Sequence, residues 1–212
     1  MAFWNAPLDN DDHAGHACSS ALAMMDMTAK FNVTLEAEAA AENKRFISIN
    51  VGIGPNSGEC CVGNTGSEQR FDYSVLGDDV NLASRLEGQS KTYGVDIVIG
   101  ENTREHARDY AYIKLDLIKV KGKNDAVRVF ALMGEPARRD DSDFQALAAS
   151  QAAMLEAYRG QRWDDARKLS AECRELDGDI GGLYDLYDEP IAEYQADPPG
   201  ADWDGVFVAT IK

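Results

Sequence analysis

The stretch that decides the fold of this chain is Tyr73-Ser74-Val75-Leu76-Gly77-Asp78-Asp79-Val80-Asn81-Leu82-Ala83-Ser84-Arg85-Leu86-Glu87. Residues 71–76 have the β-branched and aromatic composition of a strand, and Gly77-Asp78 interrupts that pattern. A helix is predicted to follow over residues 79–92, with an apolar side made of Val80, Leu82, Ala83 and Leu86. Because Asn81 and Arg85 are four residues apart, we expect their side chains to share another side of that helix.

The residue types at these two positions suit a nucleotide. Asn81 offers a neutral donor and acceptor, and Arg85 offers a planar cation whose fork matches phosphate oxygens. Beside the end of a strand, such a pair can bind a ribose and a phosphate. The spacing alone favours a solvated helix surface, where such i,i+4 pairs are common, so the pair needs support from other segments.

Composition bounds the classes of function. The chain has 212 residues and a formal net charge of −16, which opposes non-specific binding to nucleic acid or to anionic lipid surfaces. ATP is not excluded, because a phosphate site needs only a local group of donors and cations. No apolar run approaches the roughly 18 residues of a membrane span. The four cysteines lack the paired spacing of a metal site, which indicates free thiols in a reducing compartment and predicts a cytoplasmic protein.

Other segments predict a mixed α and β chain. Residues 1–7 are strand-like, and a long helical pattern covers about residues 13–43. Strands are predicted over residues 46–53 and 59–63 around a turn at Gly54-Pro55-Asn56-Ser57-Gly58. Further along, the pattern indicates a strand at 96–99, a short helix opening at 102–105, and two strands within 114–133 around a turn at 122–125.

The composition changes near residues 136–142, which are charged and loop-like. Beyond this point helices are predicted over residues 144–158, 163–176 and 180–195, followed by an apolar segment at 203–211 that could pack back on the protein. We expect this tail to cover the surface of the preceding domain. A helical interaction tail is the alternative.

The opening stretch, read as Tyr-Ser-Val-Leu-Gly-Asp-x-Val-Asn-Leu-Ala-Ser-Arg-Leu-Glu, closely resembles the motif of class III nucleotide cyclases. Residues 49–54, 63–67 and 120–123 resemble the same family in the same order, so the likeness covers roughly residues 1–135. It implies an α+β, ferredoxin-like catalytic domain over residues 1–136, with a helical extension over 137–212. Such domains form head-to-tail dimers with active sites across the interface, and an adenylate cyclase converts ATP to cyclic AMP and pyrophosphate.

The resemblance implies a role for each candidate residue. Arg85 matches the arginine that steadies the transition state, and Asn81 matches the asparagine that orients the ribose. Lys121 matches the lysine that holds the terminal phosphates, with Lys123 as its substitute. Ser74 falls where the family reads the base, and serine there favours ATP over GTP. Arg70 lies close to a second arginine that the opposite protomer lends to the phosphates.

Structural roles compete at some of these positions. Ser74 can satisfy a backbone group at a strand end, and Lys121 can protect a sheet edge from pairing. Asp78 and Asp79 could be metal ligands by residue type. They are better explained as turn and helix-capping residues beside Gly77.

The metal site is the main departure from the family pattern. The family binds two divalent ions, Mg²⁺ or Mn²⁺, through two aspartates, and no position of this chain matches either of them. The second aspartate belongs to a turn that precedes a strand like Met1-Ala2-Phe3-Trp4, which here opens the chain. One hypothesis is therefore a truncated adenylate cyclase that acts as a homodimer or beside a full-length protomer. The alternative is a catalytically inactive, cyclase-like regulatory or dimerisation module. If an anchor exists, the chain is the cytoplasmic part of a membrane-anchored receptor cyclase.

Overall fold

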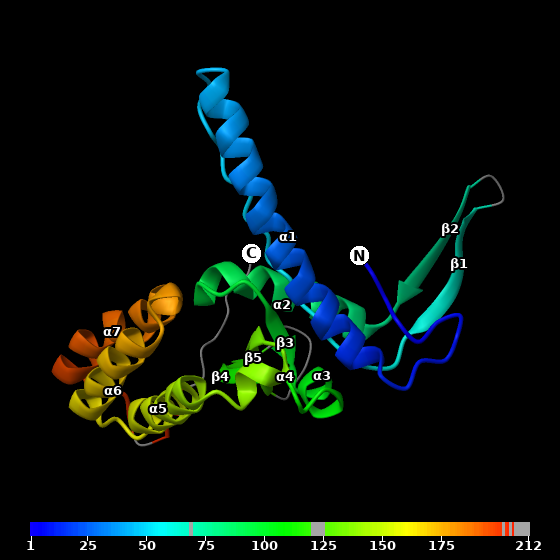
Figure 1. Ribbon diagram of the computed structural model, residues 1–212. Helices are drawn as coiled ribbons and strands as arrows, with labels where there is room; N and C mark the ends of the chain where they lie inside the picture. Colours follow the sequence, from blue (N-terminus) through cyan, green and yellow to red (C-terminus); the bar gives the residue numbers. More distant parts are fainter. Residues whose placement is uncertain (68–69, 120–125, 201, 204, 206–212) are drawn as a thin grey trace.

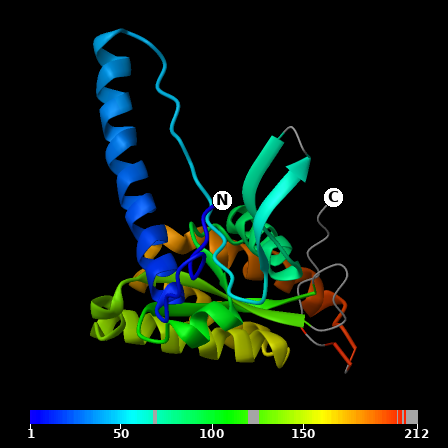
Figure 2. The ribbon, with the colours of Figure 1, turned by 90° about the vertical axis from the view of Figure 1, so that its right-hand side faces the viewer.

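The structure is a computed structural model that describes residues 1–67, 70–119, 126–200, 202–203 and 205 (Figures 1 and 2). A long N-terminal helix and a two-stranded hairpin project from a body made of a small sheet and several helices. The elements of the first part are α1 (His13–Ala41), β1 (Cys61–Ser67), β2 (Arg70–Leu76), α2 (Asp78–Tyr93), β3 (Val98–Gly100) and α3 (Glu101–His106). They are followed by β4 (Ala111–Lys119), β5 (Ala126–Gly134), α4 (Pro136–Arg139), α5 (Ser142–Arg159), α6 (Trp163–Leu176), a 3₁₀ turn (Gly178–Ile180) and α7 (Gly181–Ala196).

The body is organised around a three-stranded antiparallel sheet with the order β3-β5-β4. Alternate residues of the central strand face opposite sides, as the two-residue period of a strand requires. Val129 and Ala131 join a hydrophobic core with α2 and the C-terminal helices. Phe130 and Leu132 join a second, smaller core with the first turns of α1. The sheet therefore separates α2 on one face from the base of α1 on the other.

The C-terminal helices are held at an irregular point of strand β4. The pairing of β4 with β5 shifts register between Lys114 and Asp116, so Leu115 has no partner in the ladder. Side chains from α5 and α7 form hydrogen bonds with the backbone here. Gln151 Nε2 donates to the Lys114 carbonyl at 3.0 Å, and Tyr187 Oη donates to the Leu115 carbonyl at 2.6 Å. The helices thus donate hydrogen bonds to the backbone at the bulge, including the carbonyl of Leu115, which has no ladder partner.

Asp116 is the charged residue of the same bulge, and its side chain is buried. Arg159 of α5 forms an ion pair with it, with Nη2 at 2.9 Å from Oδ1. Burial raises the pKa of the Asp116 carboxyl, while the bond from the Leu117 amide and the charge of Arg159 oppose that rise. An aromatic cluster closes this end of the core, where the rings of Tyr158, Trp163, Tyr194 and Trp203 lie 5.4–6.4 Å apart.

The predicted helices at 79–92, 144–158, 163–176 and 180–195 are confirmed to within one or two residues by α2, α5, α6 and α7. The apolar segment at 203–211 falls mostly outside the described residues, but Trp203 does pack back on the protein. Helices on both sides of residue 136 share one hydrophobic core. The division into residues 1–136 and 137–212 stays a prediction.

Three predictions for the N-terminal part were wrong. Residues 1–7 form no strand, and residues 46–53 form only a single parallel bridge, between Ile53 and Ile97. The hairpin is instead built by β1 and β2, which pair from Cys61 opposite Leu76 to Ser67 opposite Arg70. The segment at 54–58 is therefore not a hairpin turn. The segment instead runs against α2, where the Asn56 side chain donates to the Asp79 carbonyl, and Ile53 bonds the backbone of Asp96 and Val98.

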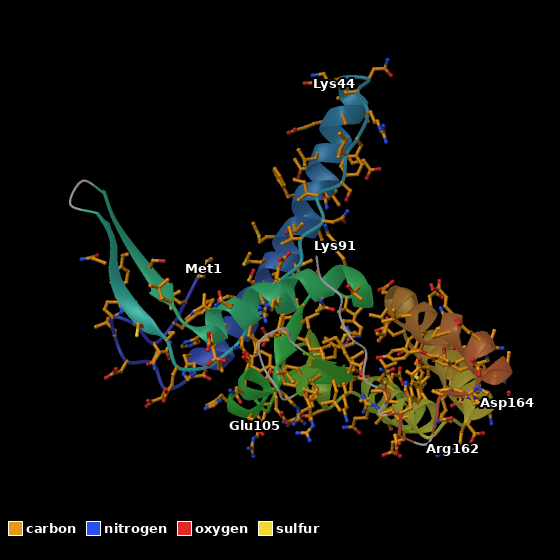
Figure 3. All side chains as sticks on the ribbon, turned by 180° about the vertical axis from the view of Figure 1, so that it is seen from behind. Met1, Lys44, Lys91, Glu105, Arg162 and Asp164 are labelled. Atoms are coloured by element: carbon orange, nitrogen blue, oxygen red, sulfur yellow. The ribbon has the colours of Figure 1, made fainter. Side chains whose placement is uncertain are left out.

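Helix α1 is anchored only at its beginning. Its buried residues are Ala14, Gly15, Cys18 and Ala21, and the rest of the helix projects as an arm whose far end lies near Lys44 (Figure 3). The returning chain runs beside the arm (Figure 2), where the Asn32 side chain bonds both the amide and the carbonyl of Ile49 at 2.9 and 2.8 Å. No helix of the described residues combines the length and the hydropathy that crossing a membrane would take.

Candidate active site

Helix α2 starts directly after strand β2, as the motif predicts. Gly77 is the residue before the helix, and Asp78 and Asp79 occupy its first turn. Carboxylates at that end are favourable because the helix macrodipole is positive there. Gly94 ends the helix in a left-handed conformation with φ of 63°, and Lys91 lies in the last turn. The two aspartates therefore belong to the start of the helix, although the capping position itself is Gly77.

The sides of α2 have different partners. Leu82, Leu86 and Tyr93 are buried in the larger core. Residues 79, 83, 87 and 90 form a second stripe, which receives the extended segment 52–58. Since each residue turns the helix by 100°, Asn81 and Arg85 lie about 160° away from Ala83 and Glu87. Asn81 is exposed and Arg85 is half-buried, so the pair lies on a side that neither the core nor the segment occupies.

Glycines let the segment 52–58 run close against α2. A side chain on Gly54 would overlap the Glu87 amide and the Ala83 carbonyl, and one on Gly58 would overlap the Asp79 carboxylate. The segment is fixed further by Asn56, whose Nδ2 donates to the Asp79 carbonyl at 3.1 Å and to Asp79 Oδ1 at 3.3 Å. These contacts fix the first turn of the helix and so the direction in which Asn81 points.

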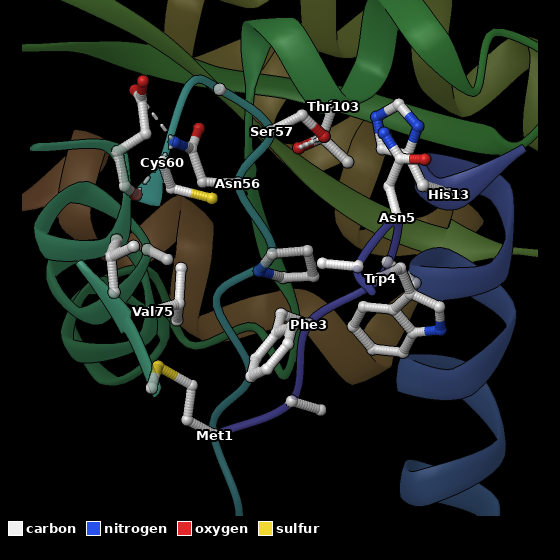
Figure 4. A pocket seen from close by; sticks show the side chains of 18 of the residues that line it. Met1, Phe3, Trp4, Asn5, His13, Asn56, Ser57, Cys60, Val75 and Thr103 are labelled. Atoms are coloured by element: carbon white, nitrogen blue, oxygen red, sulfur yellow. Dashed lines mark hydrogen bonds between the residues drawn. The ribbon is translucent and has the colours of Figure 1, made fainter. Parts of the chain in front are cut away.

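A cavity of about 510 Å³ opens at this end of α2 (Figure 4). Its apolar side is formed by Met1, Phe3 and Trp4, and its polar side by Asn5, His13, Asn56, Ser57 and Thr103. Asp79, Val80 and Ala83 contribute the α2 wall. The motif-based reasoning missed this cavity, because Asn56 and Ser57 were interpreted as parts of a turn. Asp79 borders it, at the first turn of α2.

The structure brings together only some of the candidate residues. Asn81 and Arg85 are one turn apart on α2, while Ser74 is half-buried in the hairpin, opposite Gly63. None of the three lines the cavity beside residues 1–6. Arg70 is the first residue of β2, and its side chain lies outside the described part. Lys121 and Lys123 lie outside the described residues altogether.

Comparison with known proteins gives the family. Residues 1–134 match the family described as "Adenylate and Guanylate cyclase catalytic domain". The chain belongs to the nucleotide cyclases. The class III resemblance and the α+β fold are thereby confirmed, and the match includes the hairpin, α2 and the sheet.

Similar cyclases support this assignment. Adenylate cyclase 1 of Rhizobium meliloti (strain 1021) is 33% identical over 135 residues, which cover 63% of this chain and 19% of that protein. An adenylate cyclase of Anabaena cylindrica is 35% identical over 127 residues, or 58% of this chain and 25% of that protein. The crystal structure of the adenylyl cyclase CyaB from P. aeruginosa matches with a TM-score of 0.51 and 26% identity, covering 63% of this chain and 65% of that one. This cyclase chain thus spans a quarter or less of the two curated relatives.

A cyclase domain calls for divalent metal ions, which need groups of His, Cys, Asp or Glu side chains as ligands. Within the described ranges, no group of three or more His, Cys, Asp or Glu side chains could hold a metal ion. Hard cations such as Mg²⁺ and Mn²⁺ need several oxygen ligands converging on one point. The described residues of this cyclase therefore do not fit a two-metal site, and Asp78 and Asp79 do not form one.

Proposed function

We propose that this chain supplies the ribose- and phosphate-orienting half of an adenylate cyclase active site. In the reaction, the 3′ hydroxyl of ATP loses its proton to solvent and its oxygen bonds to the α-phosphorus, while the bond from that phosphorus to the bridging oxygen breaks and pyrophosphate leaves with the electron pair. Asn81 would hold the ribose so that its 3′ oxygen is aligned for attack. Arg85 would stabilise the charge that develops on the phosphoryl oxygens. The observation that carries this proposal is the placement of both side chains one turn apart on α2, on a side that faces away from the segment 52–58.

Three further residues complete the proposed half-site. Ser74, on the strand that leads into α2, would contact the base and favour ATP over GTP. Lys121 would hold the terminal phosphates, and Arg70 would reach the phosphates of the opposite protomer. Lys123 is the substitute for Lys121. These assignments rest on the match to the family motif.

A second protomer is part of the proposal. Tyr73 and Leu76 of the hairpin are 50% and 59% exposed, although both are large and apolar. Exposed apolar groups of this kind are typical of surfaces that bind another protein. We assign these exposed side chains to the interface of a homodimer or to pairing with a full-length cyclase protomer. The full-length protomer would also bring the carboxylates for Mg²⁺ or Mn²⁺.

A catalytically inactive, cyclase-like module is the second candidate. The observation that favours it is the lack of a three-ligand metal group among the described residues. Such a module would still dimerise and bind ATP, but it would regulate its partner instead of turning over substrate.

Turnover and binding separate the two candidates. The full chain would be assayed for cyclic AMP from ATP with Mg²⁺ or Mn²⁺, alone and mixed with a full-length cyclase protomer, and ATP and GTP binding would be measured in parallel. We expect R85A and N81A each to lower turnover in the mixture by about 100-fold or more, because they stabilise the transition state. ATP binding should fall by no more than about threefold, which is the pattern of a transition-state interaction.

K91Q is the matched control, because it removes an exposed cation from the last turn of the same helix. It should leave both turnover and binding unchanged. ATP binding without turnover in any mixture would select the inactive module, whereas tighter binding of GTP would contradict the role of Ser74. A chain that binds neither nucleotide would overturn both candidates.

We place this activity in the cytoplasm, where ATP is available. All four cysteines, Cys18, Cys60, Cys61 and Cys173, are free, including the adjacent exposed pair. Free thiols in that number are typical of a reducing compartment.

A further inference from the structure

A second hollow lies on the other face of the sheet from α2. It has a volume of about 410 Å³ and is bordered by α3, β4, β5 and α5. We call it the basic groove, because three of its lining residues are Arg104, Lys114 and Arg128; Phe130 and Glu101 also line it. Phe130 belongs to the smaller core, whereas Leu82 and Leu86 of α2 belong to the larger one. The sheet therefore separates the basic groove from α2, the helix that carries Asn81 and Arg85.

Three cations in one hollow stand out in a chain whose net charge is −16. Among the described residues, one of the three has a carboxylate partner: Arg128 forms an ion pair with Glu101. The Arg104 guanidinium lies 5.0 Å from the centre of the Phe130 ring, which orients it by a cation–π contact. Across the part of the chain that the structure describes, neither Arg104 nor Lys114 has a carboxylate within ion-pair distance.

Lys114 shows that this arrangement is electrostatically unfavourable when the groove is empty. Burial lowers the pKa of its ammonium group, and the guanidiniums of Arg159 and Arg128 lower it further. Asp116 and Glu156 act in the opposite direction without cancelling the effect. A lysine that only protects the edge of a sheet would extend into water, away from other cations. Crowded cations of this kind gain most from a bound anion.

We propose that the basic groove binds a compact multivalent oxyanion, either a polyphosphate or a polycarboxylate. The volume of the groove lies in the range of small-ligand sites, which is roughly 300–1,000 Å³. Arg104 would bind one anionic group with its planar fork, and Lys114 would bind the next as a point charge. The Arg128 guanidinium would either leave Glu101 and bind the ligand, or bind the ligand and Glu101 at the same time. The two possible sources of such an anion differ in geometry, so the experiment can tell them apart.

The test uses the full chain and three probes: inorganic tripolyphosphate, citrate and sulfate. Binding would be measured by calorimetry at about 0.15 M ionic strength, where unspecific surface attraction is largely screened. We expect tripolyphosphate or citrate to bind at least about tenfold more tightly than sulfate, and the double variant R104Q/K114Q to lose about tenfold or more of that affinity. Hydrogen exchange should slow at residues 101–104, 112–114 and 128–130 when the anion binds.

R167Q/K168Q is the matched control, because it removes the same charge from exposed positions of α6. It should keep full affinity. Equal losses in the two double variants, or protection that appears at α2 instead, would overturn the proposal. So would the absence of binding by both multivalent probes.

Folding does not confound the result. Without ligand, K114Q should be as stable as the wild type or more so, since it removes a charge that burial disfavours. A purely structural lysine would instead cost stability when it is replaced. The single variant R104Q, at an exposed position, gives an independent measure of the same binding loss.

Discussion

The arm and hairpin of this protein contrast with its C-terminal body. The C-terminal helices bury large side chains against β4, and Leu115, Leu183, Tyr184 and Ile191 are fully buried. The arm, the chain that returns from it and the hairpin instead expose large apolar residues: Met24, Met27, Phe31, Val33, Ile47, Ile49, Tyr73 and Leu76 are 41–75% exposed. The body finds its partners within the chain. We infer that the arm and hairpin are shaped for a partner outside the chain, which agrees with the proposed second protomer.

The largest expected effect tests the anchoring of the body. Replacing Arg159 in R159M leaves the Asp116 carboxyl buried without its cation, and breaking a buried pair in this way costs about 3–5 kcal/mol. Urea unfolding would measure the loss. The control R162M breaks an exposed pair with Asp165, and such pairs contribute only about 0–1 kcal/mol. Equal effects of the two variants would mean that the bulge does not anchor the helices.

The same pair gives a dependence on pH. Because burial raises the pKa of Asp116, the folded protein holds this proton more tightly than the unfolded chain does. Its contribution to stability therefore falls as the pH rises from the usual range of an aspartate through the raised value. Losing Arg159 raises that pKa further, so the gap between wild type and R159M should widen with increasing pH. A gap that narrows instead would contradict a buried, cation-dependent carboxyl.

The second prediction compares two leucines at either end of the motif. Leu86 is fully buried and Leu76 is 59% exposed. L86A should lower the free energy of unfolding by about 2–5 kcal/mol, since it leaves a cavity in the core. L76A should change it by less than about 0.5 kcal/mol in dilute protein.

Protein concentration sharpens this test. If the hairpin binds a second copy, the cost of L76A should grow with concentration, because association stabilises only the folded form. A full cost for L76A at every dilution would show that the hairpin is already buried in the single chain, and the contrast between the two regions would fail.

Much of the body could be predicted from sequence, because its signals are local. Helix α2 follows from apolar spacing and the Gly77 break, and α6 was predicted with its bounds at residues 163 and 176. The strand at 46–53 was predicted from composition, but a strand also needs a neighbour over its whole length. The segment meets β3 only at Ile53, through bonds to Asp96 and Val98.

The candidate sites, too, could be predicted from sequence only where their residues are close together in the chain. Asn81 and Arg85 are four residues apart, so their joint placement on α2 could be predicted from the helical period. The cavity beside α2 combines residues 1–6 with Asn56 and Thr103, which are far apart in sequence. The basic groove likewise takes one cation each from α3, β4 and β5. Neither has a local pattern, because only the folded chain brings these residues together.

The smallest expected effect concerns the junction between the two regions. The segment 52–58 belongs to the chain that returns from the arm, and Gly54 presses it against α2 of the body. G54A would drive a methyl group into the Glu87 amide and the Ala83 carbonyl, which cannot rotate away as a side chain could. We expect a loss of about 1–3 kcal/mol, typical of overpacking, measured by urea unfolding.

Gly88 is the matched control, because it lies within α2 with open space where its side chain would be. G88A should stabilise the protein by about 0.5–1 kcal/mol, since alanine favours a helix more than glycine does. Opposite signs for two glycine-to-alanine changes on one helix would show that the arm's returning chain is seated on α2 in solution. A neutral G54A would mean that the segment stands off the helix, and Asn81 would then lose the contacts that set its direction.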